Sequence, residues 1–231
     1  MHGKFTIVKM KSTPEMIKVN KKKEQGLATQ QDIMAAAEEV FFEKGVAVTT
    51  IEHIAERANV TRGAIYWHFK NKNEFLEQII DKAAMPLLES LRAMLDKTQE
   101  VSLEHLRASN VQSILKIVRS REDARRLTIF LLKCEHTAEF QYLIDKQTQY
   151  HNEIREIYIA YLKKVEEQEG SLIKSPELIA DALIFYSAGM LTQFFKEPQR
   201  IDIDRHITDY LDIFFLSLTN RPFEAQGKTS P

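Results

Sequence analysis

Four polar side chains suited to anions and base edges fall within one short stretch, at Arg62, Tyr66, His68 and Lys72. Arginine offers paired N–H donors that match the edge of guanine. Tyrosine, histidine and lysine donate hydrogen bonds to phosphate oxygens. A short helix does not need so many polar and aromatic groups in order to fold. The stretch therefore predicts contact with a nucleic acid.

Neighbouring residues extend this predicted contact surface. The N-terminal residues of a recognition helix face the base edges, and Thr61 is expected to cap such a helix. Gly63 would let the backbone approach closely, and Thr50 would donate to a phosphate at the start of the preceding helix. The predicted DNA contacts are Thr49, Thr50, Thr61, Arg62, Gly63, Tyr66, Trp67, His68 and Lys72.

Two short helices joined by a tight turn would position this surface. Ala55 is small where the two helices must approach each other. Asn59, four residues later, tolerates the left-handed conformation that a tight turn needs. Val60 and Ile65 would then fill the space between the helices. The spacing indicates a helix-turn-helix, although patterns this short also arise by chance in helical proteins.

Start and stop signals place the remaining elements. A first helix is expected from about Thr29 to Gly45, which would end it as a left-handed glycine. Thr49 and Glu52 fit a capping box that opens the next helix. Pro86 is expected to kink or break the fourth pattern. The other predicted helices span 72–95, 102–119, 122–134, 138–168, 176–196 and 203–220.

Composition agrees with an all-α fold. The 231 residues include only 7 Gly and 6 Pro, which favours long uninterrupted helices, and 44% of them are hydrophobic, enough to bury a core. The predicted organisation is a disordered basic tail over 1–26, a helix-turn-helix domain over 27–72, a ligand-binding and dimerisation domain over 73–221, and a flexible tail over 222–231.

Charge is unevenly distributed along the chain. Residues 1–72 hold 12 Lys+Arg against 8 Asp+Glu, whereas the remainder holds 20 against 25. A basic N-terminal part on an acidic remainder fits a protein that presents one end to a polyanion. A solvated lysine tail would give the same imbalance, so charge alone leaves both interpretations open.

Little in the sequence indicates catalysis or export. Cys134, Glu135 and His136 are consecutive and would point in different directions on a helix, so we expect neither a metal nor an enzyme active site there. No cofactor is expected, and a redox-sensing thiol is the minor alternative for Cys134. A single cysteine, no signal peptide and no run of about 18 apolar residues predict a cytoplasmic protein without a membrane span.

The stretch TTIEHIAERANVTRGAIYWHFKNKNEFL (49–76) closely resembles the DNA-binding signature of the TetR family, and within it the AcrR-like repressors of multidrug efflux pumps. With AAAEEVFFEKG (35–45), which resembles the family's first helix, the match covers about residues 29–76. Asn59 is a departure, because the family usually has Gly there. RRLTIFLLKCEHTAEF (125–140) is a less specific match that favours the AcrR-like branch.

The resemblance implies an Ω-shaped homodimer in which the first three helices of each subunit bind DNA. The last two long helices would form a four-helix interface with the partner subunit. Independently, 178–195 and 207–218 are apolar on most sides and need partners on most sides, which burial in their own domain would also supply. The predicted interface is Phe185, Leu191, Phe194, Phe195, Tyr210, Phe214 and Leu218.

The resemblance also implies an effector cavity among the helices of about 85–195. A buried Glu135 would attract a cationic drug, because an unpaired buried charge is costly, although an ordinary ion pair is the alternative. Core packing is the alternative for each aromatic residue. The predicted ligand contacts are Phe130, Cys134, Glu135, Phe140, Tyr150, Tyr158, Phe185 and Met190.

Together these expectations describe a transcriptional repressor that a hydrophobic or cationic molecule releases from a palindromic operator upstream of an efflux operon. The two half-sites would lie roughly 34–36 Å apart. The helix over 72–95 would transmit the ligand signal by pivoting near Pro86. A regulator of lipid or other metabolism, and a helical interaction protein with no DNA role, are the alternatives.

Overall fold

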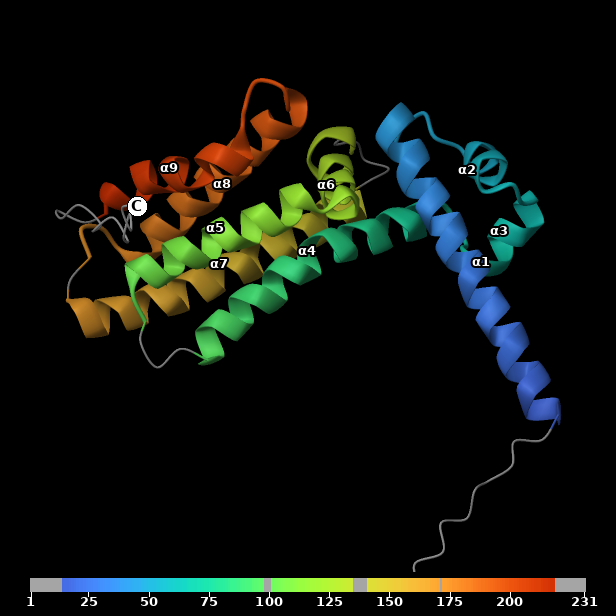
Figure 1. Cartoon of the computed structure of the whole chain (residues 1–231), viewed down its shortest axis with the longest axis horizontal. Coiled ribbons are helices and arrows are strands. Elements are labelled where there is room, and N and C mark those ends of the chain that lie inside the picture. The colour runs from blue at the N-terminus through green and yellow to red at the C-terminus, as the bar shows by residue number, and fades with distance from the viewer. Residues whose placement is uncertain (1–13, 98–100, 135–140, 171, 219–231) are drawn as a thin grey trace, which may run out of the picture.

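A computed structural model describes residues 14–97, 101–134, 141–170 and 172–218 of the chain. No strand occurs among these residues, and the all-α prediction is confirmed (Figure 1). The helices are α1 (Pro14–Lys44), α2 (Ile51–Ala58), α3 (Arg62–His68), α4 (Lys72–Lys97), α5 (Leu103–Arg119), α6 (Arg121–Thr128), the π-helical turn η1 (Ile129–Lys133), α7 (Gln141–Glu169), α8 (Pro176–Lys196) and α9 (Ile203–Leu216).

Helices α1–α3 gather at one end of the molecule, and we call them the head; α4–α9 form the body (Figure 1). Asn59 ends α2 in the left-handed conformation (φ 53°, ψ 44°), as the sequence predicts. This turn lets the Val60 N–H donate to the Ala55 carbonyl at 3.0 Å. Ile54 and Ile65 are fully buried between the crossing helices, so the turn and the packing together fix the angle between α2 and α3.

The cap at the start of α2 differs from the predicted one. Thr50 is the N-cap residue, and its partner in the capping box is His53 rather than Glu52. Thr49 is buried, and its hydroxyl donates to the Gly45 carbonyl at 2.6 Å. The prediction failed because either of two adjacent threonines could be the N-cap residue. Packing under the loop decides which of them turns inward and which one caps the helix.

The first helix begins earlier than predicted. It starts at Pro14, so the predicted disordered tail is helical from that residue onward (Figure 1), and Thr29 lies inside the helix and not at its start. Lys, Glu and Gln between Pro14 and Thr29 are good helix formers, and they extend a helix that is already nucleated by the packed segment behind them. Residues 1–13 and the predicted tail over 222–231 lie outside the described residues.

The head and the body share part of their hydrophobic core. Phe75 and Ile79 of α4, together with Ile129 of η1, are fully buried in the same cluster as the head residues Phe41 and Ile65. The core of the head therefore continues beyond residue 72, where the sequence predicts the domain boundary. Movements of α4 or η1 relative to the head must disturb this shared packing, because protein interiors are close-packed.

Two elements of the body differ from their predicted form. Helix α4 continues through Pro86 instead of breaking there, and the predicted helix over 122–134 consists of α6 followed by η1. A π-helical turn is rare and often occurs at functional sites. The predicted helices over 102–119, 176–196 and 203–220 agree with α5, α8 and α9 to within a few residues.

Helix α8 is long and apolar enough to cross a membrane by length and composition, which the sequence reading did not expect. Only 22% of its most apolar window is buried within the subunit. Leu178 and Phe185 are exposed apolar side chains of α8, and the adjacent α9 also exposes two, Ile213 and Leu216.

Candidate nucleic-acid interface and ligand cavity

Helix α3 presents an exposed face at the tip of the head. Trp67 is 86% exposed and Tyr66 is 49% exposed, whereas Ile65 between them and the core is fully buried. Thr61 caps the helix by accepting a hydrogen bond from the Ala64 N–H at 3.2 Å. Large aromatic side chains are rarely left in water without a purpose when they gather on one surface. The face is therefore a candidate for contact with a partner.

Arg62 is exposed beside this face and makes one exposed ion pair. Its guanidinium lies 2.8 Å from the Glu52 carboxylate of α2. The hydrogen bond with the Tyr66 phenol and the charge of Glu52 raise the pKa of Arg62, so the side chain is a permanent cation. An ion pair this exposed is weak and exchanges readily for another acceptor. The side chain is thus free to reach a base edge or phosphate.

Three predicted DNA contacts are placed differently from the others. Thr49 is buried and faces away from solvent, and His68 is only partly exposed. The Lys72 ammonium donates to the Val46 and Ala47 carbonyls at 3.1 and 3.4 Å. The exposed basic residue at this corner is Lys70, which the sequence reading missed. Lys70 directly follows the buried Phe69, and this position was the signal from which its exposure could have been predicted. The remaining predicted contacts, Thr50, Thr61, Arg62, Gly63, Tyr66 and Trp67, are all exposed.

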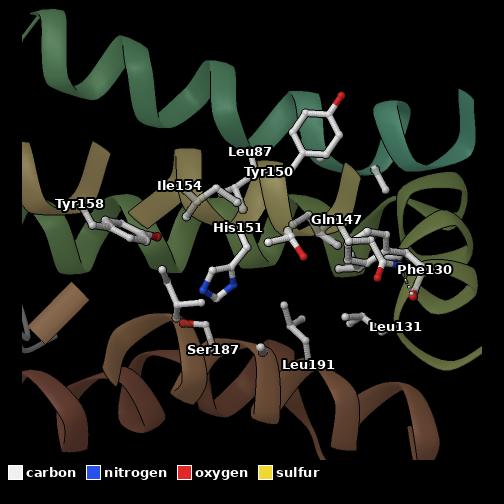
Figure 2. Close-up of a pocket in the computed structure, with 17 residues that line it drawn as sticks. Leu87, Phe130, Leu131, Gln147, Tyr150, His151, Ile154, Tyr158, Ser187 and Leu191 are labelled. Carbon is white, nitrogen blue, oxygen red and sulfur yellow. Dashed lines mark hydrogen bonds between the residues drawn. The ribbon is translucent and has the colours of Figure 1, made fainter. Parts of the chain in front are cut away.

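The body contains a cavity of about 440 Å³ that is lined by α4, α5, α6, η1, α7 and α8 (Figure 2). This is within the usual size range for a small-molecule site. Within the part of the chain that the structure describes, the residues that line it include no Asp, Glu, Lys or Arg. The lining residues are Ala83, Ala84, Leu87, Ile117, Leu127, Phe130, Leu131, Gln147, Thr148, Tyr150, His151, Ile154, Tyr158, Ile184, Ser187, Ala188 and Leu191.

Three predicted ligand contacts line this cavity: Phe130, Tyr150 and Tyr158. Phe185 is not one of them: it is 65% exposed, although its ring stacks against that of His151 on the cavity wall. Met190 packs against the core of the body instead. Glu135 and Phe140 lie outside the described residues.

Cys134 is also absent from the cavity wall and packs against the core of the head. Burial raises the pKa of its thiol to about 11. A thiol with so high a pKa is almost entirely protonated at neutral pH and reacts slowly with oxidants. The redox-sensor alternative therefore has no support from this environment.

Four polar residues of the cavity were not predicted from the sequence: Gln147, Thr148 and His151 of α7 and Ser187 of α8 (Figure 2). All four reside on helices whose apolar residues dominated the sequence pattern, so nothing local marked them. Tyr150 was predicted, and its hydroxyl donates to Asp81 of α4 at 2.5 Å. Burial, followed by this hydrogen bond, raises the pKa of Tyr150 to about 12.

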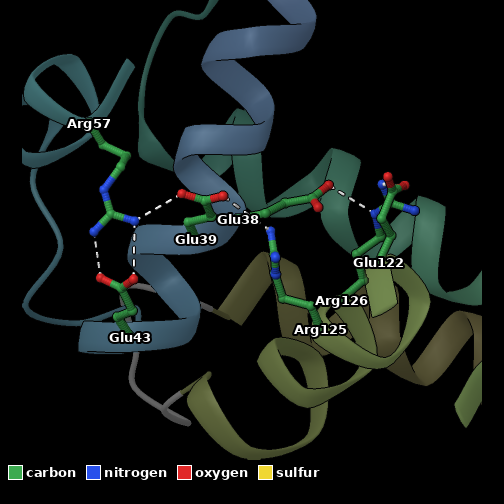
Figure 3. A network of polar contacts seen from close by, with 7 residues as sticks. All are labelled: Glu38, Glu39, Glu43, Arg57, Glu122, Arg125 and Arg126. Atoms are coloured by element: carbon green, nitrogen blue, oxygen red, sulfur yellow. Dashed lines mark hydrogen bonds and ion pairs between the residues drawn. The ribbon is translucent and has the colours of Figure 1, made fainter. Parts of the chain in front are cut away.

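A network of ion pairs lies where α1 of the head meets α2 and α6 (Figure 3). Arg126 of α6 binds the buried carboxylate of Glu38 on α1 at 2.9 Å. Arg57 of α2 bridges Glu39 and Glu43 of α1 at 2.9 and 2.5 Å. We call the Glu38–Arg126 pair the head clasp. The head clasp connects α1 of the head to α6, which continues directly into η1.

The predicted dimer residues divide into two groups. Leu191 and Leu218 are buried within the subunit, each 8% exposed, and so cannot form much of an interface. Phe185 is exposed, while Phe194, Phe195, Tyr210 and Phe214 are partly exposed. Leu178, Ile213 and Leu216 join the exposed apolar set without having been predicted. Helical periodicity marks apolar residues but does not say which side faces the subunit's own core.

Comparisons with known proteins show which proteins the chain is similar to. Residues 33–79 match the family model of bacterial regulatory proteins, tetR family. The transcriptional repressor BepR of Brucella suis is 29% identical over 80% of this chain and 88% of that protein.

Two solved structures are similar over almost their full length. The first is NalD, described as the secondary repressor of the MexAB-OprM multidrug efflux pump in Pseudomonas aeruginosa. It has a TM-score of 0.74 and 27% identity over 85% of this chain and 98% of that chain. The second is SmeT of Stenotrophomonas maltophilia in complex with triclosan, with a TM-score of 0.73 and 28% identity over 88% and 98%. With its helix-turn-helix head and this fold, the chain belongs to the TetR family of bacterial transcriptional regulators.

Proposed function

We propose that the protein is a homodimeric, cytoplasmic repressor that leaves its operator when a small molecule enters the cavity. The observation that carries this proposal is the exposed face of α3, with Arg62, Tyr66 and Trp67, on a head that matches the family's DNA-binding model. A recognition helix of this kind lies in the major groove. Arg62 would read a base edge, while Thr50 and Lys70 would meet phosphates.

The exposed apolar faces of α8 and α9 support dimerisation. Phe185 and Ile213 are 65% and 66% exposed in the single subunit. Apolar patches of this kind on a soluble protein mark interaction sites. A second copy of the chain would cover them with the same two helices, as expected for a two-fold interface. The dimer would present two α3 helices to a palindromic operator.

The walls of the cavity support a route from ligand to head. Ala83 and Leu87 of α4 line the cavity, and the first turns of α4 are buried in the core of the head. In η1, Phe130 lines the cavity while the preceding Ile129 is fully buried in the core of the head. A ligand that pushes α4 or η1 outward would therefore shift the head. It must bind the DNA-incompetent arrangement more tightly, because equal affinity shifts nothing.

Control of a multidrug efflux operon is the regulatory role that we infer. NalD is a repressor of a multidrug efflux pump, and SmeT is both an efflux repressor and a triclosan-binding protein. The apolar cavity of this chain suits hydrophobic compounds of the kind that efflux pumps export.

A binding assay on DNA from upstream of the protein's own gene tests the proposal. Fluorescence anisotropy should show specific binding whose affinity falls steeply as salt concentration rises, because phosphate contacts release counterions. An unrelated duplex of equal length is the control. Equal affinity for both duplexes at every salt concentration would contradict an operator-specific repressor.

A further inference from the structure

The polar groups of the cavity are already paired within the protein, with two exceptions. The Tyr150 hydroxyl donates to Asp81, and the Tyr158 hydroxyl donates to Asn110 at 2.7 Å. The Thr148 hydroxyl donates to the Ile144 carbonyl at 2.9 Å, and the Gln147 amide donates to the Phe130 carbonyl at 3.5 Å. The three hydroxyl groups therefore have no hydrogen left for a ligand, whereas Gln147 keeps a second N–H and its side-chain carbonyl oxygen.

Ser187 is the first exception. Its Oγ is the one buried side-chain oxygen or nitrogen without a hydrogen-bond partner among the residues that the structure describes. Buried hydroxyls nearly always have a hydrogen-bond partner, because the hydrogen bonds that they made to water in the unfolded chain would otherwise be lost without replacement. An unpaired one on the wall of an apolar cavity indicates that the missing partner belongs to a molecule that enters the cavity.

His151 is the second exception, and it lines the same cavity from the facing helix α7 (Figure 2). Its ring lies nearly parallel to that of Phe185, with centroids 6.5 Å apart. An imidazole edge offers a donor or an acceptor, depending on its tautomer. A ligand hydroxyl can accept from one of these two groups and donate to the other, whichever tautomer His151 adopts.

The charges of the lining residues restrict the chemical class of the ligand further. Among the described residues that line the cavity there is no carboxylate, ammonium or guanidinium, so a charged ligand would lose its hydration without gaining a counter-charge from them. Glu135, on which the prediction of a cationic effector depends, lies outside the described residues. We infer that the effector is a neutral apolar molecule with a hydroxyl group, which Ser187 and His151 hold between α7 and α8.

The inference deepens the proposed function, and it is tested on binding alone, without DNA. Isothermal titration calorimetry on the full-length protein at neutral pH would compare four probes with one ring system. These are 1-naphthol, naphthalene, 1-naphthoate and 1-naphthylmethylammonium. We expect 1-naphthol to bind at least about tenfold more tightly than each charged probe and more tightly than naphthalene.

Ser187→Ala should weaken 1-naphthol binding by about fivefold to tenfold, the loss of one hydrogen bond, and leave naphthalene binding unchanged. Ser113→Ala is the matched control, because Ser113 lies on α5 at a neighbouring cavity. The Tm of Ser187→Ala should not fall, since an unpaired hydroxyl is removed.

Tighter binding of the ammonium or carboxylate probe would overturn the inference, as would equal 1-naphthol affinity in Ser187→Ala and the wild type. Binding of 1-naphthol without release of operator DNA would instead count against the proposed function and leave the ligand class standing.

Discussion

At the scale of single residues, Arg62 carries the proposed sequence specificity. Its guanidinium is exposed and only loosely held by Glu52. Arg62→Ala should cost about 1–3 kcal/mol against the preferred operator and relax the preference at one base pair in each half-site. Competition anisotropy against operators with single base changes would measure this.

Lys70→Ala is the matched control for that prediction, because Lys70 is exposed and basic but placed for phosphate contact. This variant should weaken every duplex about equally and reduce the salt slope by about 1. If Arg62→Ala also lost affinity equally on all sequences, Arg62 would be a phosphate contact and not a base reader.

At the scale of elements, the head clasp holds α1 to α6. Glu38 is 3% exposed, so Arg126→Met would leave a buried carboxylate without its cation. Breaking such a pair costs about 3 kcal/mol or more, which should lower the Tm by roughly 6–12 °C. Differential scanning calorimetry would measure the change.

Two further variants serve as controls for that prediction. Arg119→Met removes an exposed pair with Asp204, with both side chains about 60% exposed, and should change stability by less than about 1 kcal/mol. The double variant Glu38→Met/Arg126→Met removes both charges and should recover most of the lost stability. A single Arg126→Met variant as stable as Arg119→Met would show that the clasp contributes nothing.

At the scale of the whole molecule, the exposed faces of α8 and α9 should hold two subunits together. Phe185→Glu/Ile213→Glu places four carboxylates in the proposed dimer interface, two from each subunit, and should yield monomers. Operator affinity should then fall by about 10²-fold or more, because two heads no longer bind as one unit. Sedimentation velocity and anisotropy would measure the two effects.

Val48→Glu is the control for dimerisation, since Val48 is 62% exposed but lies in the head. It should leave the sedimentation coefficient unchanged. A double variant that sediments as a dimer would place the interface elsewhere on the molecule.

Much of the head could be predicted because its signals are local. Gly45 and Asn59 have positive φ, and Thr61 and Ser175 cap their helices, as their residue types and positions indicate. Each of these features depends on contacts within about four residues, where side-chain chemistry and backbone geometry are directly linked.

The composition of the cavity could be predicted only in part. Phe130 and Tyr150 were found because large aromatic residues in that region stand out, whereas Ser187 has no local signal. Periodicity shows that a helix has an apolar side, but it does not identify the neighbour on that side. The outward position of Phe185 was missed for the same reason.

The sequence by itself determined the helical class, the turn at Asn59 and the polar face of α3, because backbone propensity and short-range capping act within a few residues. Tertiary structure alone decided that Lys72 binds the Val46 carbonyl 26 residues away and that Arg126 pairs with Glu38 across 88 residues. It also decided that Ser187 faces a cavity with no partner. Such contacts depend on which helix faces each side chain are packed together, and that choice is made by the whole core at once.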